Sequence, residues 1–267
     1  MTRLSVSLAF MKKSFLIKII TAVSLAIFAV CIIILLLQSK GCGESEGYEE
    51  TVVYPSLQES SSETETTDED IPYASPIDWE ELWQKNTDIY SWLYIPGTEI
   101  SYPIVQSDTD DTFYLTHDAY KKEYKGGSIM SEHRYTSKTF EDPVTILYGH
   151  KMRSGAMLGT LQPTYSDEKS FKEHQEIIIY LPDKELHYRI WATTPYDNSH
   201  ILAKYDFTNG RHVQLFINEI KSIRSIEGQL DETMDVNLND RFLVLSTCLM
   251  GKVKNRYLVI ARLEAVD

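Results

Sequence analysis

The sequence contains very little cysteine. Its three cysteines lie at positions 31, 42 and 248. After Cys42 the chain holds a single thiol, Cys248, which excludes a domain stabilised by internal disulfides over that part. A single thiol facing an oxidising exterior is a liability unless it is buried or used. Cys248 is therefore a candidate for chemistry.

Positive charge is also scarce. Lysine and arginine total 26 residues against 39 aspartates and glutamates, which gives a formal net charge of −13. No basic stripe is present to neutralise phosphates, so this composition excludes nucleic acid as the expected partner. Acidic residues gather in SSSETETTDED, within a stretch from Gly41 to Ser75 that has no basic residue. Few apolar residues and mutual repulsion predict an acidic, flexible spacer over residues 39–75.

One segment lacks charge altogether. Residues 19–37 read IITAVSLAIFAVCIIILLL, a run that nearly crosses a hydrocarbon core of about 30 Å. With Phe15–Ile17 and a snorkelling Lys18, it predicts a transmembrane anchor over residues 15–38. The basic residues before it predict a cytoplasmic N-terminus, residues 1–14, and a single-pass type II protein of the cell membrane whose remaining chain is extracellular.

Two alternatives to an anchor concern cleavage. A signal peptide usually has an apolar core of only about 7–15 residues and a site of small residues, which is not evident here. A lipoprotein would use Gly41 and Cys42, but Lys40 fits such a site badly. The uncleaved anchor is the favoured interpretation.

From residue 76 to 267 the composition becomes globular, and most of the expected elements are strands. IDWEELWQKN predicts a short amphipathic helix with apolar contacts at Ile77, Leu82 and Trp83. Short runs rich in Val, Ile, Tyr and Thr follow: SWLYIPGTEISYPIVQ, GGSIMSE, PVTILYGH, EIIIYLP, LHYRIWATTPY, RFLVLSTC and RYLVIARL. Seven or eight such strands predict a mostly β domain built as a closed or nearly closed barrel.

A longer helix is predicted between LHYRIWATTPY and RFLVLSTC. Thr208 or Asn209 is a plausible N-cap. Apolar residues then recur at spacings of three and four, at Val213, Phe216, Ile217, Ile220 and Ile223. Such a stripe is more often core than a partner site.

Cys248 ends one predicted strand and requires a helper if it acts as a nucleophile. A cysteine thiol has a pKa of about 8.5, so little thiolate exists at neutral pH without a base or a cation beside it. Seven histidines follow the spacer: His117, His133, His150, His174, His187, His200 and His212. His150 stands out because it directly follows the VTILYG strand, and function concentrates at strand ends.

Arg256 opens the strand that follows Cys248. If the two strands are antiparallel neighbours, residues 249–255 form the connecting loop and Arg256 lies beside Cys248. Its permanent charge could hold a developing oxyanion, while the alternative is an ordinary cation at a strand edge. No convincing metal-ligand spacing or phosphate-binding glycine loop is present, so neither a metal nor a cofactor is expected.

These motifs resemble the sortases, the cysteine transpeptidases of Gram-positive surfaces, over about residues 79–263. LSTC at 245–248 resembles the TLxTC signature, YGH at 148–150 resembles the histidine segment, and Arg256 falls at the family's arginine position. Within the family, the motif order of SWLYIPGTEISYPIVQSDTDDTFYLTHD, GGSIMSEHR and ILYGHKMRSGAMLGTL resembles class B.

The resemblance implies a closed eight-stranded barrel with N-terminal helices and a helix between the sixth and seventh strands. It implies that Cys248 attacks the carbonyl after Thr in an LPxTG-like or NPxTN-like sorting motif of a surface protein. Arg256, with groups at Thr247 and Ser246, would steady the oxyanion, and His150 would protonate the departing amine. The acceptor would be an amine of the peptidoglycan cross-bridge or of a pilin lysine.

Three positions depart from the family pattern. The first threonine of the signature is Val244, the residue after His150 is Lys151, and the loop LMGKVKN after Cys248 is basic. The loop puts any acidic helper at that place in doubt. The residues leave open a pilin-polymerising enzyme, a hydrolytic cysteine peptidase and a non-catalytic surface-binding protein on the same fold.

Overall fold

The computed structural model describes residues 52, 54, 55, 57 and 73–267. The predicted cytoplasmic segment 1–14 and the predicted anchor 15–38 lie outside the described residues, as does most of the predicted spacer. None of the helices described is long and apolar enough to cross a membrane.

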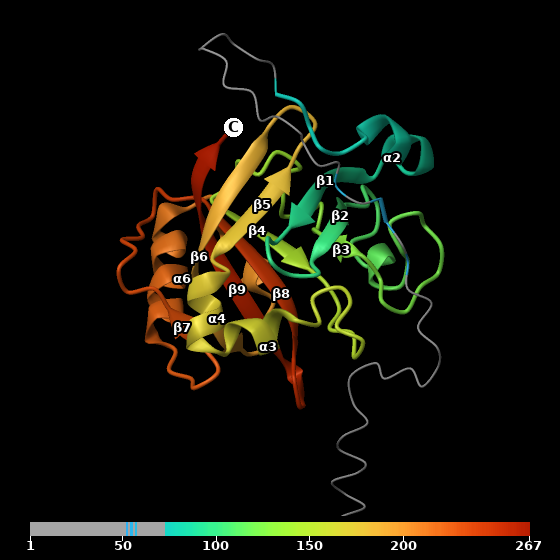
Figure 1. The fold of residues 1–267 in the computed structure, drawn as a ribbon. Helices are drawn as coiled ribbons and strands as arrows, with labels where there is room; N and C mark the ends of the chain where they lie inside the picture. The colour runs from blue at the N-terminus through green and yellow to red at the C-terminus, as the bar shows by residue number, and fades with distance from the viewer. Residues whose placement is uncertain (1–51, 53, 56, 58–72) are drawn as a thin grey trace, which may run out of the picture. The chain divides into compact units, whose positions relative to one another are not determined.

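Eight strands form a closed barrel, as predicted (Figure 1). The strands are β1 (Ile89–Tyr94), β2 (Ser101–Val105), β3 (Ile129–Met130), β4 (Val144–Tyr148), β5 (Glu176–Tyr180), β6 (Glu185–Tyr196), β8 (Phe242–Leu249) and β9 (Lys252–Val266). Their order is β5-β1-β2-β3-β4-β8-β9-β6, and the pairing of β5 with β6 closes the ring. The two-residue β7 (Gln229–Leu230) adds to the other edge of β6.

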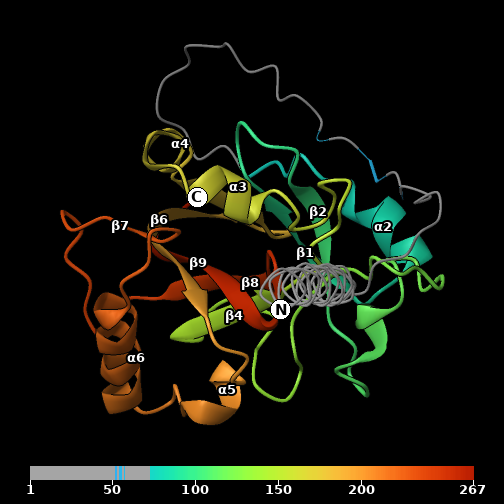
Figure 2. The ribbon, with the colours of Figure 1, turned by 90° about the horizontal axis from the view of Figure 1, so that it is seen from below.

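The described helices lie outside the barrel wall. They are α2 (Trp79–Lys85), α3 (Leu161–Tyr165), α4 (Glu168–Glu173), α5 (Ile201–Lys204) and α6 (Gly210–Ser222), with a 3₁₀ turn η1 (Phe113–Leu115). In Figure 2, α5 and α6 flank β4, β8 and β9, whereas α3 and α4 lie on the other side of the molecule. The helix predicted between the sixth and seventh barrel strands is therefore confirmed as α6. Among the described residues, one helix, α2, precedes β1.

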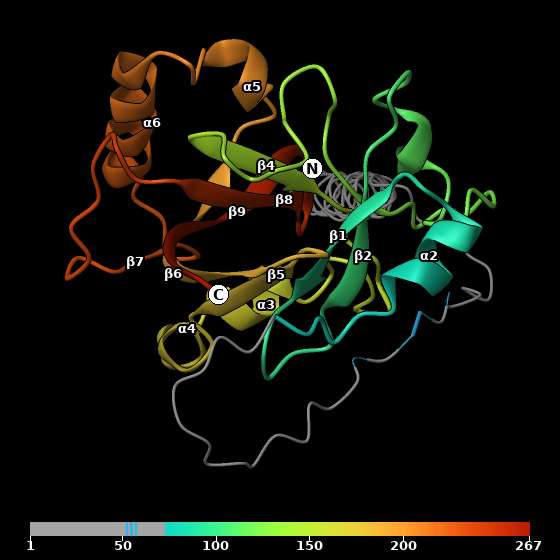
Figure 3. The ribbon, with the colours of Figure 1, turned by 90° about the horizontal axis from the view of Figure 1, so that it is seen from above.

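The capping and apolar pattern of α6 agree with its sequence. Asn209 is the N-cap, and its side chain accepts from the Arg211 N–H. Val213, Phe216 and Ile217 are buried against the outer face of β4, β8 and β9. Figure 3 shows α5 and α6 on the same side of these strands. Burial of this stripe, at about 1.5–3 kcal/mol for each large apolar side chain, holds the helix on the barrel.

The contacts of α2 differ from the prediction at one residue. Trp83, expected in the core, is 40% exposed, and Trp79 is buried in its place with Leu82 and Ile77. The Asp78 side chain caps the helix and sets its start one turn before Leu82. Trp79 and Leu82, three residues apart, then share the buried face of the helix. Trp83 is partly exposed and donates its indole N–H to the Ile89 carbonyl.

Part of the predicted spacer packs on the domain. Tyr54 and Leu57 lie against the buried cluster that contains Trp92, Tyr114 and Trp79. The segment VVYPSL is an apolar island within an otherwise acidic stretch, which gives it a face to bury.

Candidate active site

Cys248, Arg256 and His150 meet at one end of three adjacent strands. β8 and β9 are antiparallel, and Cys248 lies directly opposite Arg256. β4 and β8 are parallel with Tyr148 opposite Ser246, and the Gly149 N–H donates to the Ser246 carbonyl. Continuing this register by two residues places His150 beside Cys248 on the other flank. The main chain of Cys248 therefore lies between that of Arg256 on one side and that of His150 on the other.

The loop between Cys248 and Arg256 is shorter than predicted. β9 begins at Lys252 rather than at Arg256, and Leu249 pairs with Lys252 across a tight turn. Gly251 has a φ of +74°, which suits the turn. A β-bulge between Cys248 and Leu249 absorbs the difference, so the predicted pairing of Cys248 with Arg256 still holds.

Strand alternation decides which side chains reach the surface at this end. Leu243 and Leu245 point into the barrel, whereas Val244 points outward beneath α6. Cys248 lies on the same outward face of β8 as Val244, four residues further along the strand. It is half-buried, and its thiol is reduced. Ser246 and Thr247 are buried, at 4% and 2% exposure.

Arg256 is held close to the thiol. Its Nη1 lies 3.9 Å from Cys248 Sγ. On the opposite side of β9, Arg256 pairs with Tyr196, the last residue of β6. A half-buried guanidinium in this position stabilises negative charge that develops on the sulfur or on an oxygen bound beside it.

His150 is held by a main-chain carbonyl. Its Nε2 lies 2.9 Å from the Leu115 carbonyl oxygen in η1. Because a carbonyl only accepts, Nε2 carries a proton, and Nδ1 holds the lone pair of the neutral ring. Nothing in the local sequence pattern predicts this contact, because a backbone carbonyl carries no side-chain signal.

A glycine allows that carbonyl to lie where it does. Gly127 has a φ of +57°, and a Cβ there would lie 2.6 Å from the Tyr114 carbonyl oxygen and 2.8 Å from that of Leu115. The Ser128 N–H also donates to the Tyr114 carbonyl. Only glycine permits this approach of the two chain segments. The close approach at Gly127 thus supports the position of the histidine.

The half-buried Glu132 and Tyr148 lie near Arg256. Burial and the neighbouring Glu132 carboxylate raise the pKa of Tyr148, whereas the charge of Arg256 opposes the shift. Glu132 Oε1 lies 2.9 Å from His200 Nε2. Since His200 Nδ1 accepts the Ala203 N–H as the N-cap of α5, its Nε2 donates to Glu132. Sequence reasoning missed this link between α5 and the β3–β4 connection.

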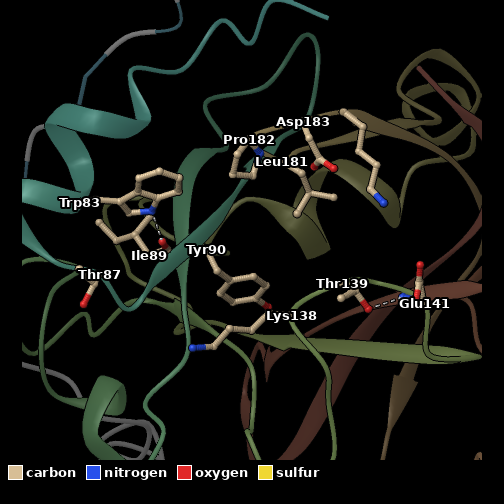
Figure 4. A pocket seen from close by; sticks show the side chains of 11 residues that line it. Trp83, Thr87, Ile89, Tyr90, Lys138, Thr139, Glu141, Leu181, Pro182 and Asp183 are labelled. Atoms are coloured by element: carbon tan, nitrogen blue, oxygen red, sulfur yellow. Dashed lines mark hydrogen bonds between the residues drawn. The ribbon is translucent and has the colours of Figure 1, made fainter.

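A pocket lies at the opposite end of the barrel from Cys248. Its volume is about 510 Å³, and it is lined by residues of α2, β1, the β3–β4 loop and the β5–β6 turn (Figure 4). Trp83, Tyr90 and Leu181 form its apolar walls. Because Glu141 lies before β4 while His150 lies after it, this pocket is separate from Cys248.

Comparison with known proteins identifies a family for the barrel domain. The family model of the sortase domain matches residues 93–264. Sortase B of Staphylococcus aureus (strain NCTC 8325 / PS 47) is 29% identical over 196 residues, which cover 71% of this chain and 75% of that protein. Sortase B of Listeria monocytogenes is 29% identical over 168 residues, 63% of this chain and 65% of that protein.

Solved structures show the same likeness. The X-ray structure of Clostridium perfringens sortase B has a TM-score of 0.62 and 25% identity, covering 70% of this chain and 99% of that one. A Staphylococcus aureus sortase B–substrate complex has a TM-score of 0.60 and 26% identity, covering 69% and 83%.

Proposed function

The chain belongs to the sortase family, in class B, and from this premise we propose that it joins surface proteins to an amine of the cell wall. The proposed substrate is a C-terminal sorting motif similar to LPxTG or NPxTN, cleaved after its Thr. The proposed acceptor is an amine of the peptidoglycan cross-bridge. The observation that carries the proposal is the position of Cys248 between Arg256 and His150 on adjacent strands.

In the first half-reaction, Cys248 Sγ attacks the Thr carbonyl carbon as the thiolate, while His150 is protonated. The sulfur–carbon bond forms, and the carbonyl oxygen becomes an oxyanion. Arg256 lies 3.9 Å from the sulfur, so its fork of donors can hold that oxyanion at the same time. Main-chain N–H groups near Thr247 are further candidate donors, because the Ser246 and Thr247 side chains are buried.

Collapse of this intermediate breaks the carbon–nitrogen bond. His150, as imidazolium, gives a proton to the departing amine, and a thioester remains on Cys248. In the second half-reaction an acceptor amine attacks the thioester, His150 takes its proton, the sulfur–carbon bond breaks, and the Cys248 thiolate is regenerated. The reaction requires Cys248 to be deprotonated and His150 to be protonated. Its rate should therefore pass through a maximum as pH varies.

The sequence supports a location for this reaction. The predicted anchor at 15–38 and the basic residues before it favour a type II protein of the cell membrane, with the barrel facing the wall. Retention at this surface would bring Cys248 to proteins that leave the cell. Accessibility of barrel lysines to a membrane-impermeant reagent on intact cells tests this orientation, and labelling only after lysis would refute it.

Peptide acylation tests the proposed chemistry. The full chain in detergent would be incubated with libraries of LPxTG-like and NPxTN-like peptides, with and without amines, beside Cys248→Ala. Intact-mass spectrometry should find an acyl adduct that requires Cys248 and passes to the amine. An adduct that only hydrolyses would indicate a peptidase instead. A folded chain with a reactive thiol that forms no adduct with any peptide would contradict the proposal.

A further inference from the structure

Tyr54, in the membrane-proximal part of the chain, sits in an aromatic socket on the barrel. Its ring lies edge-on to Trp92 of β1 and Tyr102 of β2, with centroids 6.4 and 6.1 Å away. The Tyr120 ring is 5.5 Å away at a tilt of 51°. Edge-to-face aromatic pairs at these distances contribute about 0.5–1.5 kcal/mol each beyond the area they bury.

The hydroxyl of Tyr54 is also held. It accepts a hydrogen bond from the Ala119 N–H at 3.3 Å. Burial is the main cause that raises the pKa of Tyr54, and Asp118 adds to the shift, so the phenol stays protonated. Pro55 lines a small pocket together with Trp92 and Leu82 of α2. Tyr54 is thus held both by its ring and by its hydroxyl.

Tyr102, on one side of the socket, is hydrogen-bonded to the loop that begins with His150. The Tyr102 hydroxyl accepts the Met157 N–H at 3.0 Å. Met157 pairs with Lys151 in an isolated bridge, and the Leu158 N–H donates to the His150 carbonyl at 3.0 Å. The loop that begins with His150 therefore closes on itself and is fastened to the barrel at Tyr102, whose ring Tyr54 supports.

Ala119 and Tyr120, on the other side of the socket, lie in the chain segment that binds the His150 side chain. Ala119 and Tyr120 belong to the same β2–β3 connection as Leu115, whose carbonyl binds His150 Nε2. The Tyr124 N–H donates to the Thr116 carbonyl within this connection. Tyr54 thus contacts Tyr102, which binds the loop after His150. It also contacts Ala119 and Tyr120, which belong to the connection whose Leu115 carbonyl binds the His150 ring.

We propose that Tyr54 is a positioning residue of the active site. Tyr54 and Leu57 belong to the catalytic domain. The contacts of Tyr54 with Trp92, Tyr102 and Ala119 keep the His150 loop and the η1 carbonyl in register with Cys248. A domain that begins at residue 76 would lack this support. The catalytic part of this inference rests on the proposed transpeptidation, whereas the structural part does not.

The test compares three variants of the full chain in detergent. Tyr54→Ala removes the ring, and Tyr54→Phe keeps the ring and removes only the long hydroxyl contact. Tyr180→Ala is the matched control, because Tyr180 belongs to the same buried cluster but its ring stacks on Tyr94 of β1, which lies outside both segments that hold His150. Hydrogen exchange at residues 116–124 and 150–158 is measured together with the rate of Cys248 acylation across pH.

Tyr54→Ala should speed exchange of the Ala119, Met157 and Leu158 amides while β8 and β9 stay protected. Acylation should slow by about tenfold, because a small displacement of a reacting group is costly. Tyr54→Phe should restore acylation and the protection of Met157 and Leu158 but not that of Ala119, because the Ala119 N–H loses its acceptor. Tyr180→Ala should change neither segment. If Tyr54→Ala and Tyr180→Ala exchange alike at 150–158, the inference is wrong. If no peptide acylates the wild-type chain, the proposed function is wrong. The exchange data then still test whether Tyr54 positions the two segments that hold His150.

Discussion

The two ends of the barrel each hold a histidine, in opposite ways. At the Cys248 end, His150 is fixed by one neutral carbonyl, that of Leu115. At the other end, His187 is surrounded by carboxylates: Nδ1 lies 3.0 Å from Glu176, and Nε2 lies 2.9 Å from Glu185 and 3.4 Å from Asp267. Burial disfavours the charged form of His187, but the bonds to Glu176 and Glu185 outweigh it and raise its pKa.

The difference separates a structural histidine from one suited to proton transfer. Carboxylates on both nitrogens hold a proton in place and stabilise one charge state. A carbonyl on one nitrogen fixes the ring orientation and tautomer but adds no charge, so the other nitrogen can exchange its proton with a reactant. Both histidines follow or lie in β strands, and their different environments come from what the fold brings around them.

The largest expected effect separates the two histidines directly. His150→Gln should slow acylation of Cys248 by about 10²–10⁴-fold, because the leaving amine loses its proton donor. His187→Gln, the same substitution at the other end, should leave the rate within about twofold of wild type, since nothing at that end reaches the thiol. Single-turnover acylation by mass spectrometry measures both. Similar losses of rate in the two variants would contradict the distinction between a catalytic His150 and a structural His187.

The next effect tests the cation beside the thiol. Arg256→Lys should slow acylation by about 10²-fold, because a lysine keeps the charge but loses the fork of donors aimed at the oxyanion. The control is Arg262→Lys on the same strand, where the guanidinium contacts Glu264 and the Asp235 carbonyl instead. A rate for Arg256→Lys equal to that of Arg262→Lys would limit Arg256 to a charge effect.

A third substitution tests the carbonyl that orients His150. Gly127→Ala would push against the Tyr114 and Leu115 carbonyls and strain a positive φ. Acylation should fall by about tenfold, with the maximum of the pH profile displaced, because the imidazole is no longer held at Nε2. Gly97→Ala is the control: its φ is +76°, but its new Cβ would meet only the His174 side chain. If both alanine variants keep the wild-type profile, the carbonyl has no positioning role.

The smallest effect concerns stability at the His187 end. Because folding raises the pKa of His187, its contribution is fully present below the unfolded pKa of about 6.5 and is lost as pH rises through the folded value. The loss should be below about 1 kcal/mol, since the cluster is partly exposed. Thermal unfolding between pH 6 and 9 should show it in the wild type and not in His187→Gln. An equal slope in that variant would assign the pH dependence elsewhere.

Much of the barrel was predictable because local pattern and fold agree. The runs EIIIYLP and RFLVLSTC became β5 and β8, and the spacing of Val213, Phe216 and Ile217 predicted α6. GGSIMSE became a strand of only two residues, since β3 pairs with β2 through two positions and with β4 through one. Such truncation depends on neighbouring strands and leaves no local trace.

The surface contacts were harder to predict. The charge of 39–75 suggested a uniform spacer, yet Tyr54 and Leu57 pack on the barrel. The apolar residues of VVYPSL were a local signal, but their partners Trp92 and Tyr102 are distant in sequence. Composition averaged over the stretch concealed a short segment with a face to bury.

By itself, the sequence determined the candidates and the strand pattern: a single thiol at a strand end, a histidine after another strand, and an arginine that a short return would place beside the thiol. Residue type and periodicity suffice for this because they act locally. Only the tertiary structure decided what surrounds each group. The Leu115 carbonyl on His150, the carboxylates on His187 and the socket of Tyr54 all join segments far apart in the chain, and their geometry follows from barrel closure.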